Sequence, residues 1–249
     1  MKDKVVILGT GTAREQLVSF LASRRVATIP LEQMALYEVL AVFDLETGCD
    51  DRKRVWLTRV EQVIPSQVPI FTSVLHRTAT EIASWLAHPA RVVGFSPLQF
   101  ADMPVLEVSR PMQAEGDAGW PAHLQVLTRW GKAVEEVGDE PGLVFPRTLA
   151  LLVNEAAFAL AEGIAAKEDI DLAMRKGTNW PFGPLEWADH VGIDQIVAIL
   201  TGLHRELGEE RYRPAPLLRK MIYAGYVGRA SGRGFYRYED KLAQKGEEG

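Results

Sequence analysis

Short apolar runs that alternate with helix-like segments are the feature that most constrains the fold of the first half of this chain. The strand candidates are residues 5–8, 26–29, 39–43, 70–71 and 91–94. The first three end at a glycine, a proline and an aspartate, and apolar side chains at helical spacing separate the candidates. Continuous apolar strands linked by helices are typical of a parallel sheet. The sequence therefore predicts an α/β fold for this half.

In the second half, from Leu143 onward, apolar residues recur at the spacing that is typical of a helix. Its helix candidates are residues 149–160, 170–174, 193–207 and 215–224. A polar connection over residues 113–120 and a further helix over residues 123–136 precede them. We therefore expect an α/β domain over residues 1–112, an all-α domain over residues 113–240 and a charged tail over residues 241–249.

Composition and charge exclude several other classes of protein. The chain has 249 residues, of which 47% are apolar, and a net charge of -5. Because its basic residues are scattered, nucleic acid is not expected as a partner. A single cysteine, Cys49, cannot form an internal disulfide, and no apolar run approaches the roughly 20 residues of a membrane span. We expect a complete, untargeted cytoplasmic protein that does not interact with membranes.

A glycine turn follows the first strand candidate. Gly9, Gly11 and Thr12 stand where a dinucleotide-binding turn would approach a pyrophosphate, next to the free N–H groups of the following helix. Arg14 occupies the position of the third glycine, which normally allows close packing of helix on strand. The alternative interpretation is a tight strand-to-helix connection that binds nothing.

Two carboxylates are candidates for the adenosine and nicotinamide ribose contacts. Glu32 lies about 20 residues beyond the glycine turn, the usual distance for a ribose-binding acid. Asp44 follows the third strand candidate. Each has a simpler alternative, a solvated surface carboxylate for Glu32 and a strand-end cap for Asp44.

Several blocks of the second half carry a family resemblance. They are Asp139–Gly142, Asn154–Ala156, Glu162–Gly163, Lys167–Asp171, Gly177–Pro184, residues 191–194 and Gly232–Tyr236. In this order they resemble the NAD-dependent L-3-hydroxyacyl-CoA dehydrogenases of fatty-acid β-oxidation. The resemblance implies a shortened Rossmann-like NAD-binding domain followed by the helical domain of that family, with NAD as cofactor and acyl-CoA as substrate. It also implies a homodimer formed through the C-terminal domain, with a cleft between the domains.

The catalytic residues of that family are only partly present. In the family a histidine takes the hydroxyl proton while hydride leaves for the nicotinamide, and a glutamate orients the histidine. Glu107 matches this glutamate, but Ser96 stands where the histidine belongs. A serine hydroxyl does not titrate near neutral pH and needs a base of its own. Pro146 replaces a family asparagine, and residues 31–38 stand in place of a strand and helical hairpin that help to hold coenzyme A.

One histidine could restore a base. His76 falls in the loop after a strand candidate, at the edge where open α/β sheets place ligands. The alternative is an ordinary solvated or capping histidine. We interpret His88, His123, His190 and His204 as structural, and we find no residue spacing typical of a metal site.

Three hypotheses about function follow. The first is an NAD-dependent 3-hydroxyacyl-CoA dehydrogenase with altered catalytic residues, namely Glu107, Ser96 and His76. The second is a catalytically inactive member that binds nucleotide or acyl-CoA, and the third is a structural partner protein. Family resemblance favours the first, and the residues, with the histidine absent, favour the second.

Overall fold

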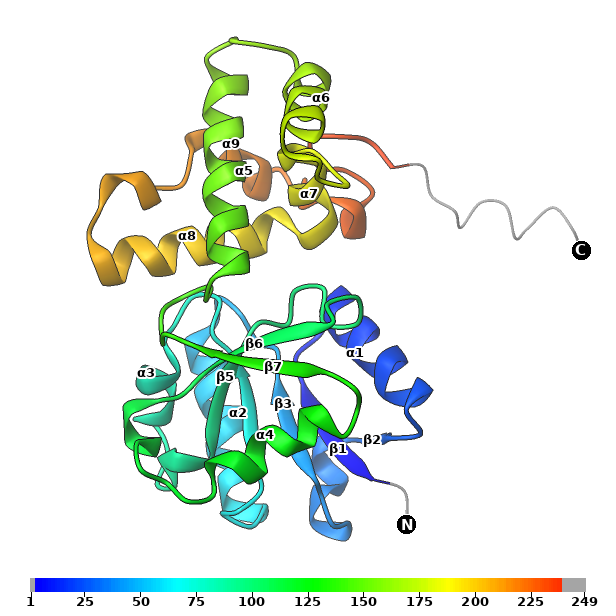
Figure 1. Ribbon diagram of the computed structural model, residues 1–249, viewed down its shortest axis with the longest axis vertical. Coiled ribbons are helices and arrows are strands. Elements are labelled where there is room, and N and C mark those ends of the chain that lie inside the picture. Colours follow the sequence, from blue (N-terminus) through cyan, green and yellow to red (C-terminus); the bar gives the residue numbers. More distant parts are fainter. Residues whose placement is uncertain (1–2, 239–249) are drawn as a thin grey trace, which may run out of the picture. The chain divides into compact units, whose positions relative to one another are not determined.

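The computed structural model describes residues 3–238. The chain forms two compact units, Met1–Arg147 and Thr148–Gly249. The first contains all of the sheet and the second is helical, as the ribbon shows (Figure 1). The α/β class and the helical second half predicted from the sequence are confirmed.

The sheet of the first unit has seven strands in the order β2-β1-β3-β4-β5-β6-β7. They are β1 (Lys4–Leu8), β2 (Ala27–Ile29), β3 (Ala41–Asp44), β4 (Ile70–Ser73), β5 (Val92–Phe95), β6 (Val105–Ser109) and β7 (Ala133–Val137). Neighbouring strands pair in parallel except β5 and β6, which are antiparallel. The first five strands are the expected apolar runs.

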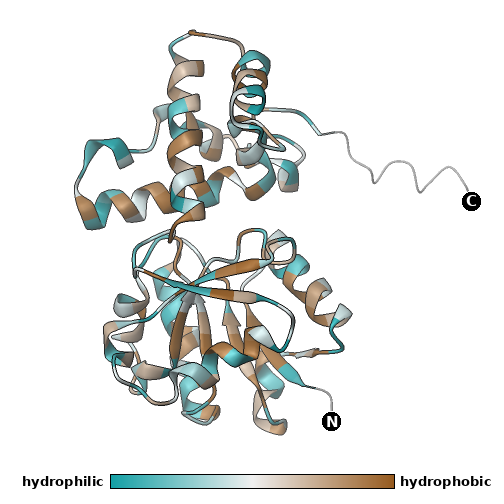
Figure 2. Ribbon diagram, viewed as in Figure 1, coloured by the Kyte–Doolittle hydropathy of each residue, from teal (hydrophilic) through white to brown (hydrophobic). Residues whose placement is uncertain are grey.

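Helices cover both faces of this sheet. Side chains alternate between the two faces along each strand, so each strand contributes apolar side chains to both hydrophobic layers. On one face Val5, Ala41 and Phe43 pack against α1 (Thr12–Ser23) and α4 (Trp120–Thr128). On the other face Val6 and Val42 pack against α2 (Asp50–Val63) and α3 (Ala79–Ala83). The strands are accordingly among the most hydrophobic segments of the unit (Figure 2). Both faces are buried, as expected for a mostly parallel sheet.

The connection between β2 and β3 is short. A 3₁₀ turn, Leu31–Leu36, replaces the strand and hairpin that the family resemblance leads one to expect there. In the sheet β1 lies between β2 and β3, so the chain direction of the crossovers reverses at β1. In open α/β sheets ligands bind at the carboxyl ends of strands at such a change of direction. The deletion therefore leaves the usual place for a ligand intact.

One expectation from the sequence was wrong. The helix predicted over residues 123–136 ends at Thr128, and Ala133–Val137 forms β7 beside β6. Gly131, with φ of 83°, turns the chain between them. Pairing with β6 outweighs a local apolar spacing that fits either structure.

The compact unit that contains the sheet extends beyond residue 112, where the sequence predicts the end of the first domain. Residues 113–147 belong to the first unit, because α4 and β7 pack on its sheet. Asp139 ties this segment to the start of α3, accepting hydrogen bonds from Ala79 N and Thr80 N at 2.7 and 2.8 Å. The charged tail expected over residues 241–249 lies outside the described residues.

The second unit consists of helices that follow the predicted order. They are α5 (Phe145–Ala161), which begins in the first unit, α6 (Lys167–Thr178), α7 (Pro184–Val191), α8 (Ile193–Leu207) and α9 (Pro216–Tyr223). Two buried carboxylates hold the unit together. Asp171 accepts from Leu185 N and Glu186 N, and Asp189 accepts from Phe235 N and Tyr236 N.

The backbone segments that pack closely against these carboxylates require glycine at the point of contact. A Cβ on Gly183 would overlap Asp171, whereas a Cβ on Gly177 would enter open space at a helical position without positive φ. We expect Gly183→Ala to lower stability by about 1–3 kcal/mol, or roughly 2–10 °C in Tm. Gly177→Ala, the matched control in the same unit, should be neutral or stabilising by up to about 1 kcal/mol. Equal melting temperatures for the two variants in thermal denaturation would contradict this account.

Candidate functional site

The glycine turn after β1 adopts a backbone conformation that favours glycine at two positions. Gly9 and Gly11 adopt φ of 104° and 84°, in the region that favours glycine. A Cβ on Gly9 would come within 3.1 Å of Leu45 Cβ, whereas the space beside Gly11 is open. Helix α1 begins at Thr12 without a side-chain cap, so its first N–H groups lack a side-chain acceptor. The residues present fit a dinucleotide pyrophosphate.

Arg14 does not block this turn. The core-facing residues of α1 are Leu17, Phe20 and Leu21, with Ala13 packed beside them in the first turn. Arg14 is half-buried and is not part of that core. The helix therefore packs on the sheet through a small side chain even though the third glycine is absent.

Glu32 is exposed in the first turn of the 3₁₀ segment that follows β2. Since β2 pairs in parallel with β1, the residues after the two strands lie at the same edge of the sheet. Glu32 is thus at the edge that carries the glycine turn, where the sequence predicted a ribose contact.

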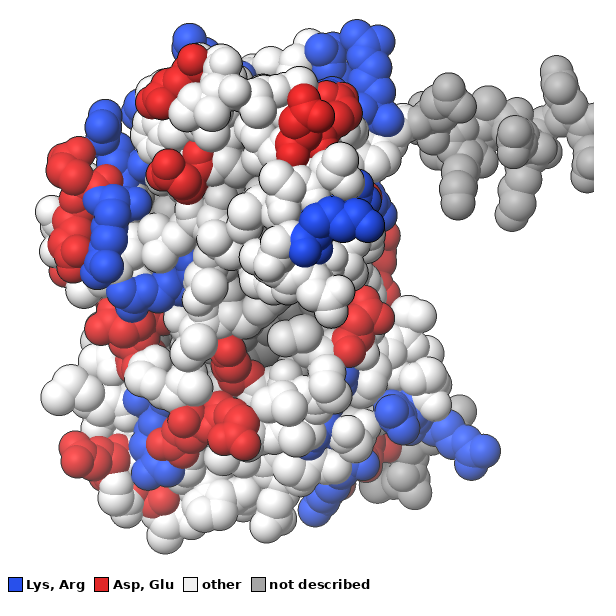
Figure 3. All heavy atoms as spheres, turned by 45° about the horizontal axis from the view of Figure 1, so that its top comes forward, with Lys and Arg blue, Asp and Glu red and all other residues white. Residues whose placement is uncertain are grey.

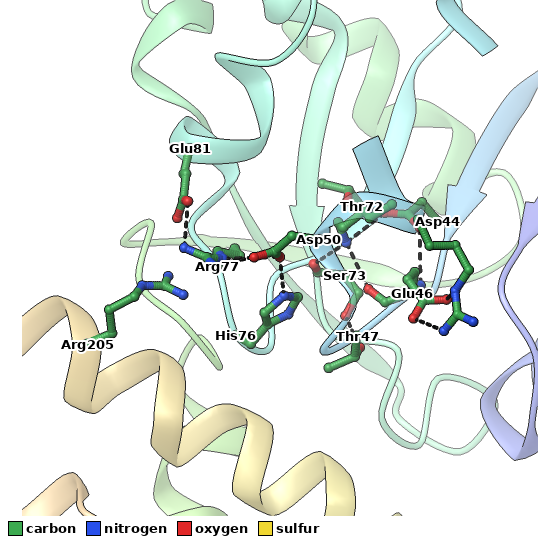
Figure 4. Close-up of polar contacts among 12 residues, drawn as sticks. Asp44, Glu46, Thr47, Asp50, Thr72, Ser73, His76, Arg77, Glu81 and Arg205 are labelled. Atoms are coloured by element: carbon green, nitrogen blue, oxygen red, sulfur yellow. Dashed lines mark hydrogen bonds and ion pairs between the residues drawn. The ribbon is translucent and has the colours of Figure 1, made fainter. Parts of the chain in front are cut away.

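Asp44 occupies the expected strand end, but it is fully buried and its carboxylate is engaged within the chain. Its Oδ2 lies 2.7 Å from Lys53 Nζ and accepts from Thr72 Oγ1 at 2.6 Å. Its Oδ1 accepts from Glu46 N at 3.1 Å. These contacts leave Asp44 as a strand-end anchor rather than a carboxylate open to a ribose (Figure 4).

Lys53 is the residue of this edge that reasoning from the sequence missed. Besides its ion pair it donates to Glu46 O at 3.0 Å and to Ser73 O at 2.9 Å. It therefore joins α2 to the ends of β3 and β4. One signal was available, because Lys53 shares the spacing of the buried Leu57 and Val60 on one face of α2. A lysine at a core position needs charged and polar partners.

Ser96 and Glu107, the two residues at the family's catalytic positions, line one small cavity. Glu107 accepts from Val144 N at 2.9 Å and from Phe145 N at 3.0 Å, and so holds the start of α5. Ser96 Oγ accepts from Leu98 N at 3.2 Å. Pro146 lines the same cavity. The structure thus brings these predicted residues together, with a hydroxyl where an imidazole was expected from the family.

His76 has a different set of neighbours. Its Nε2 lies 2.9 Å from Asp50 Oδ1 at the start of α2, and Arg77 pairs with both Asp50 and Glu81. Figure 4 shows this chain of contacts. His76 does not line the Ser96–Glu107 cavity. Burial lowers the pKa of His76 to about 4, with the opposing effect of Asp50 only partly offsetting it.

The described residues contain neither a cluster that could hold a metal ion nor a helix that could cross a membrane. No group of three or more His, Cys, Asp or Glu side chains that could hold a metal ion occurs among residues 3–238. Within the same residues no helix is long and apolar enough to span a membrane. Basic and acidic side chains are interspersed on the face shown in Figure 3, without a continuous basic stripe.

Comparison with known proteins gives a consistent result. A model of the 3-hydroxyacyl-CoA dehydrogenase C-terminal domain matches residues 142–238. The chain is 31% identical over 230 residues to a 3-hydroxybutyryl-CoA dehydrogenase of Bradyrhizobium diazoefficiens, covering 87% of this chain and 78% of that protein. A solved (S)-3-hydroxybutyryl-CoA dehydrogenase of Ralstonia eutropha superposes with a TM-score of 0.76 at 26% identity, covering 96% of this chain and 100% of that one.

Some relatives match over a shorter stretch. A Bacillus subtilis protein named a probable 3-hydroxybutyryl-CoA dehydrogenase is 37% identical over 187 residues, covering 74% of this chain and 64% of that protein. A Deinococcus radiodurans protein of the same name is 40% identical over 162 residues, covering 64% of this chain and 57% of that protein. The chain thus spans less than two thirds of these two relatives.

The sheet order and the glycine turn define a Rossmann-like α/β unit, joined to a helical unit. The chain belongs to the 3-hydroxyacyl-CoA dehydrogenase family of oxidoreductases.

The buried His76 generates a prediction about stability and pH. Because its folded-state pKa of about 4 lies below the usual 6.5, the unfolded chain binds the proton first as pH falls. Stability should therefore be lost between about pH 6.5 and 4, by up to about 3 kcal/mol from this residue. His76→Gln should lose correspondingly less in denaturant titrations over this range. The exposed His88→Gln is the control, and the idea fails if both variants keep the full pH dependence.

Proposed function

We propose that the chain is an NAD-dependent 3-hydroxyacyl-CoA dehydrogenase with altered catalytic residues. The observation that supports this most directly is the glycine turn, which has open space beside Gly11 at the point where β1 lies between β2 and β3. Family membership supports the reaction class. Gly9, Gly11 and Thr12 would hold the pyrophosphate, and Glu32 the adenosine ribose. NAD, when bound, supplies the acceptor for the substrate hydride.

The residues that would handle the hydroxyl proton differ from those of the family. His76 with Asp50 is a histidine–carboxylate pair, the arrangement used by general bases whose imidazole is oriented by an acid. With a pKa of about 4 the ring is neutral at physiological pH and can accept a proton, although it is a weak base. Ser96 and Glu107 would contact the substrate from their shared cavity, and Lys53 would fix the strand ends beside them.

A second candidate function is binding without turnover. Two observations favour it: a serine lines the cavity beside Glu107, and the low pKa of His76 weakens the alternative base. In this case the protein would hold nucleotide or acyl-CoA through the same glycine turn. For both candidates the family resemblance supports a homodimer formed through the helical unit. The single cysteine, Cys49, which cannot form an internal disulfide, supports a cytoplasmic location.

Cofactor binding can be tested at Gly11. Gly11→Asp should weaken NADH binding at least about tenfold, because a carboxylate would occupy the pyrophosphate space. Gly116→Asp is the matched control, since Gly116 also has positive φ, 75°, and open space beside it. Calorimetric titration of NADH into both variants measures the difference. Equal dissociation constants would mean that the turn is only architectural.

Turnover separates the two candidates. We expect the protein to oxidise NADH in the presence of acetoacetyl-CoA, and His76→Gln to reduce the rate at least about 100-fold, as loss of a general base does. The exposed His88→Gln should leave it unchanged. Full activity in His76→Gln would remove this residue from the reaction. NADH binding without measurable turnover in the unsubstituted protein would favour the binding function.

A further inference from the structure

The segment between β3 and α2 carries three acids whose carboxylates already have partners within the chain. Asp44 is fully buried and accepts hydrogen bonds through both oxygens. Glu46 accepts from Arg52, with Nε 2.8 Å from Oε2 and Nη2 2.5 Å from Oε1. Asp50 Oδ1 lies 2.9 Å from His76 Nε2. A ligand hydroxyl that reaches this segment therefore meets carboxylates that are already engaged.

A threonine hydroxyl of the same segment stays within reach of a ligand. Thr47 is half-buried, and its Oγ1 lies 3.1 Å from the Oγ of Ser73, the last residue of β4. Because Ser73 is fully buried, a ligand can reach this hydroxyl pair only through Thr47. A hydroxyl has one donor and two acceptor sites, so Thr47 can bond to Ser73 and still bind another group. Figure 4 shows the two side chains at the ends of the strands.

Thr47 belongs to a segment that packs against the glycine turn. A Cβ on Gly9 would lie 3.1 Å from Leu45 Cβ and 3.4 Å from Glu46 N. The amide of Leu45 donates to Leu8 O at 3.0 Å, which fixes the segment to the end of β1. The hydroxyl of Thr47 is thus two residues from the direct contact with the turn that would hold the pyrophosphate.

The strand order indicates which half of a dinucleotide would lie over this hydroxyl. Glu32 follows β2, the glycine turn follows β1 and Thr47 follows β3, and the sheet order is β2-β1-β3-β4. These strands are parallel, so their carboxyl ends lie at one edge. A dinucleotide with its adenosine at Glu32 and its pyrophosphate at the turn continues over the ends of β3 and β4. The first group on that side of the pyrophosphate is the nicotinamide ribose.

From these observations we infer that Thr47 binds a hydroxyl of the nicotinamide ribose and that Ser73 positions the Thr47 side chain for this contact. The inference rests on the proposed NAD binding, and it assigns to Thr47 the contact that the sequence predicts for Asp44. A neutral hydroxyl at this point recognises the sugar. It adds no charge that would favour one redox state of the nicotinamide ring over the other.

The test compares three ligands in calorimetric titrations of the full chain. ADP ends at the pyrophosphate, ADP-ribose adds the second ribose, and NADH adds the nicotinamide ring. Thr47→Val removes the hydroxyl and keeps the shape of the side chain. It should raise the dissociation constants of NADH and ADP-ribose about three- to tenfold, as expected for one lost hydrogen bond, and leave that of ADP unchanged. Thr47→Ser keeps the hydroxyl and should bind all three ligands with unchanged affinity.

Two further variants test the neighbours of Thr47. Ser73→Ala removes the partner of the Thr47 hydroxyl, so it should weaken NADH and ADP-ribose binding but not ADP binding. Asp51 is an exposed acid in the first turn of α2 and is the alternative ribose partner at this edge. Asp51→Asn is therefore the control, and it should leave all three dissociation constants unchanged.

Several results would overturn the inference. An equal loss of ADP affinity in Thr47→Val would show a general disturbance of the edge, and a loss for NADH alone would place the contact at the nicotinamide ring. Weaker NADH binding in Asp51→Asn, with Thr47→Val unchanged, would assign the ribose to the acid. If Ser73→Ala binds all three ligands normally, Ser73 has no positioning role. If the unsubstituted protein binds neither ADP nor NADH, the proposed cofactor site is itself wrong.

Discussion

The buried ion pair between Asp44 and Lys53 is the interaction on which the carboxyl edge of the sheet depends. Both groups are fully buried, so each must find partners inside the protein. Besides its ion pair with Asp44, Lys53 donates to the carbonyls of Glu46 and Ser73. Asp44 in turn accepts hydrogen bonds from the Thr72 hydroxyl and the Glu46 amide. One lysine thereby fixes α2 against the ends of β3 and β4. The segment that follows β3, which forms part of the candidate site, is held in place by this arrangement.

The same edge shows how the family fold is retained while the residues at the catalytic positions differ. Binding of a dinucleotide depends on backbone geometry at the glycine turn, and a shortened connection between β2 and β3 leaves that geometry in place. Proton transfer depends on one side chain of suitable pKa. Ser96 lacks it, and His76 has a histidine–carboxylate pairing but a low pKa caused by burial. The glycine turn thus keeps the pattern of a dinucleotide-binding turn, whereas the side chains at the catalytic positions depart from the family's pattern.

The two edges of the sheet have different chemistry for a structural reason. At the carboxyl edge, charged groups are paired within the chain, as Lys53 and Arg77 show. At the amino edge, Arg91 donates to the carbonyls of Val68 and Ile64, and the side chains of Leu36 and Tyr37 in the short β2–β3 connection are exposed. The short β2–β3 connection thus links the two edges: Glu32 lies at the carboxyl edge, and residues 34–40 form part of the wall of a cavity at the amino edge.

The sequence by itself determined the α/β class, the first five strands, the helical second half, the glycine turn and the family. These follow from local apolar periodicity and from glycines and prolines at fixed spacing. Both signals arise from residues that are close together in the sequence. Only the tertiary structure decided that 133–137 is a strand, that the first unit extends to Arg147, that Asp44 is paired with Lys53 and that His76 is bonded to Asp50. Each of these depends on groups distant in sequence, whose burial and pairing no local pattern records.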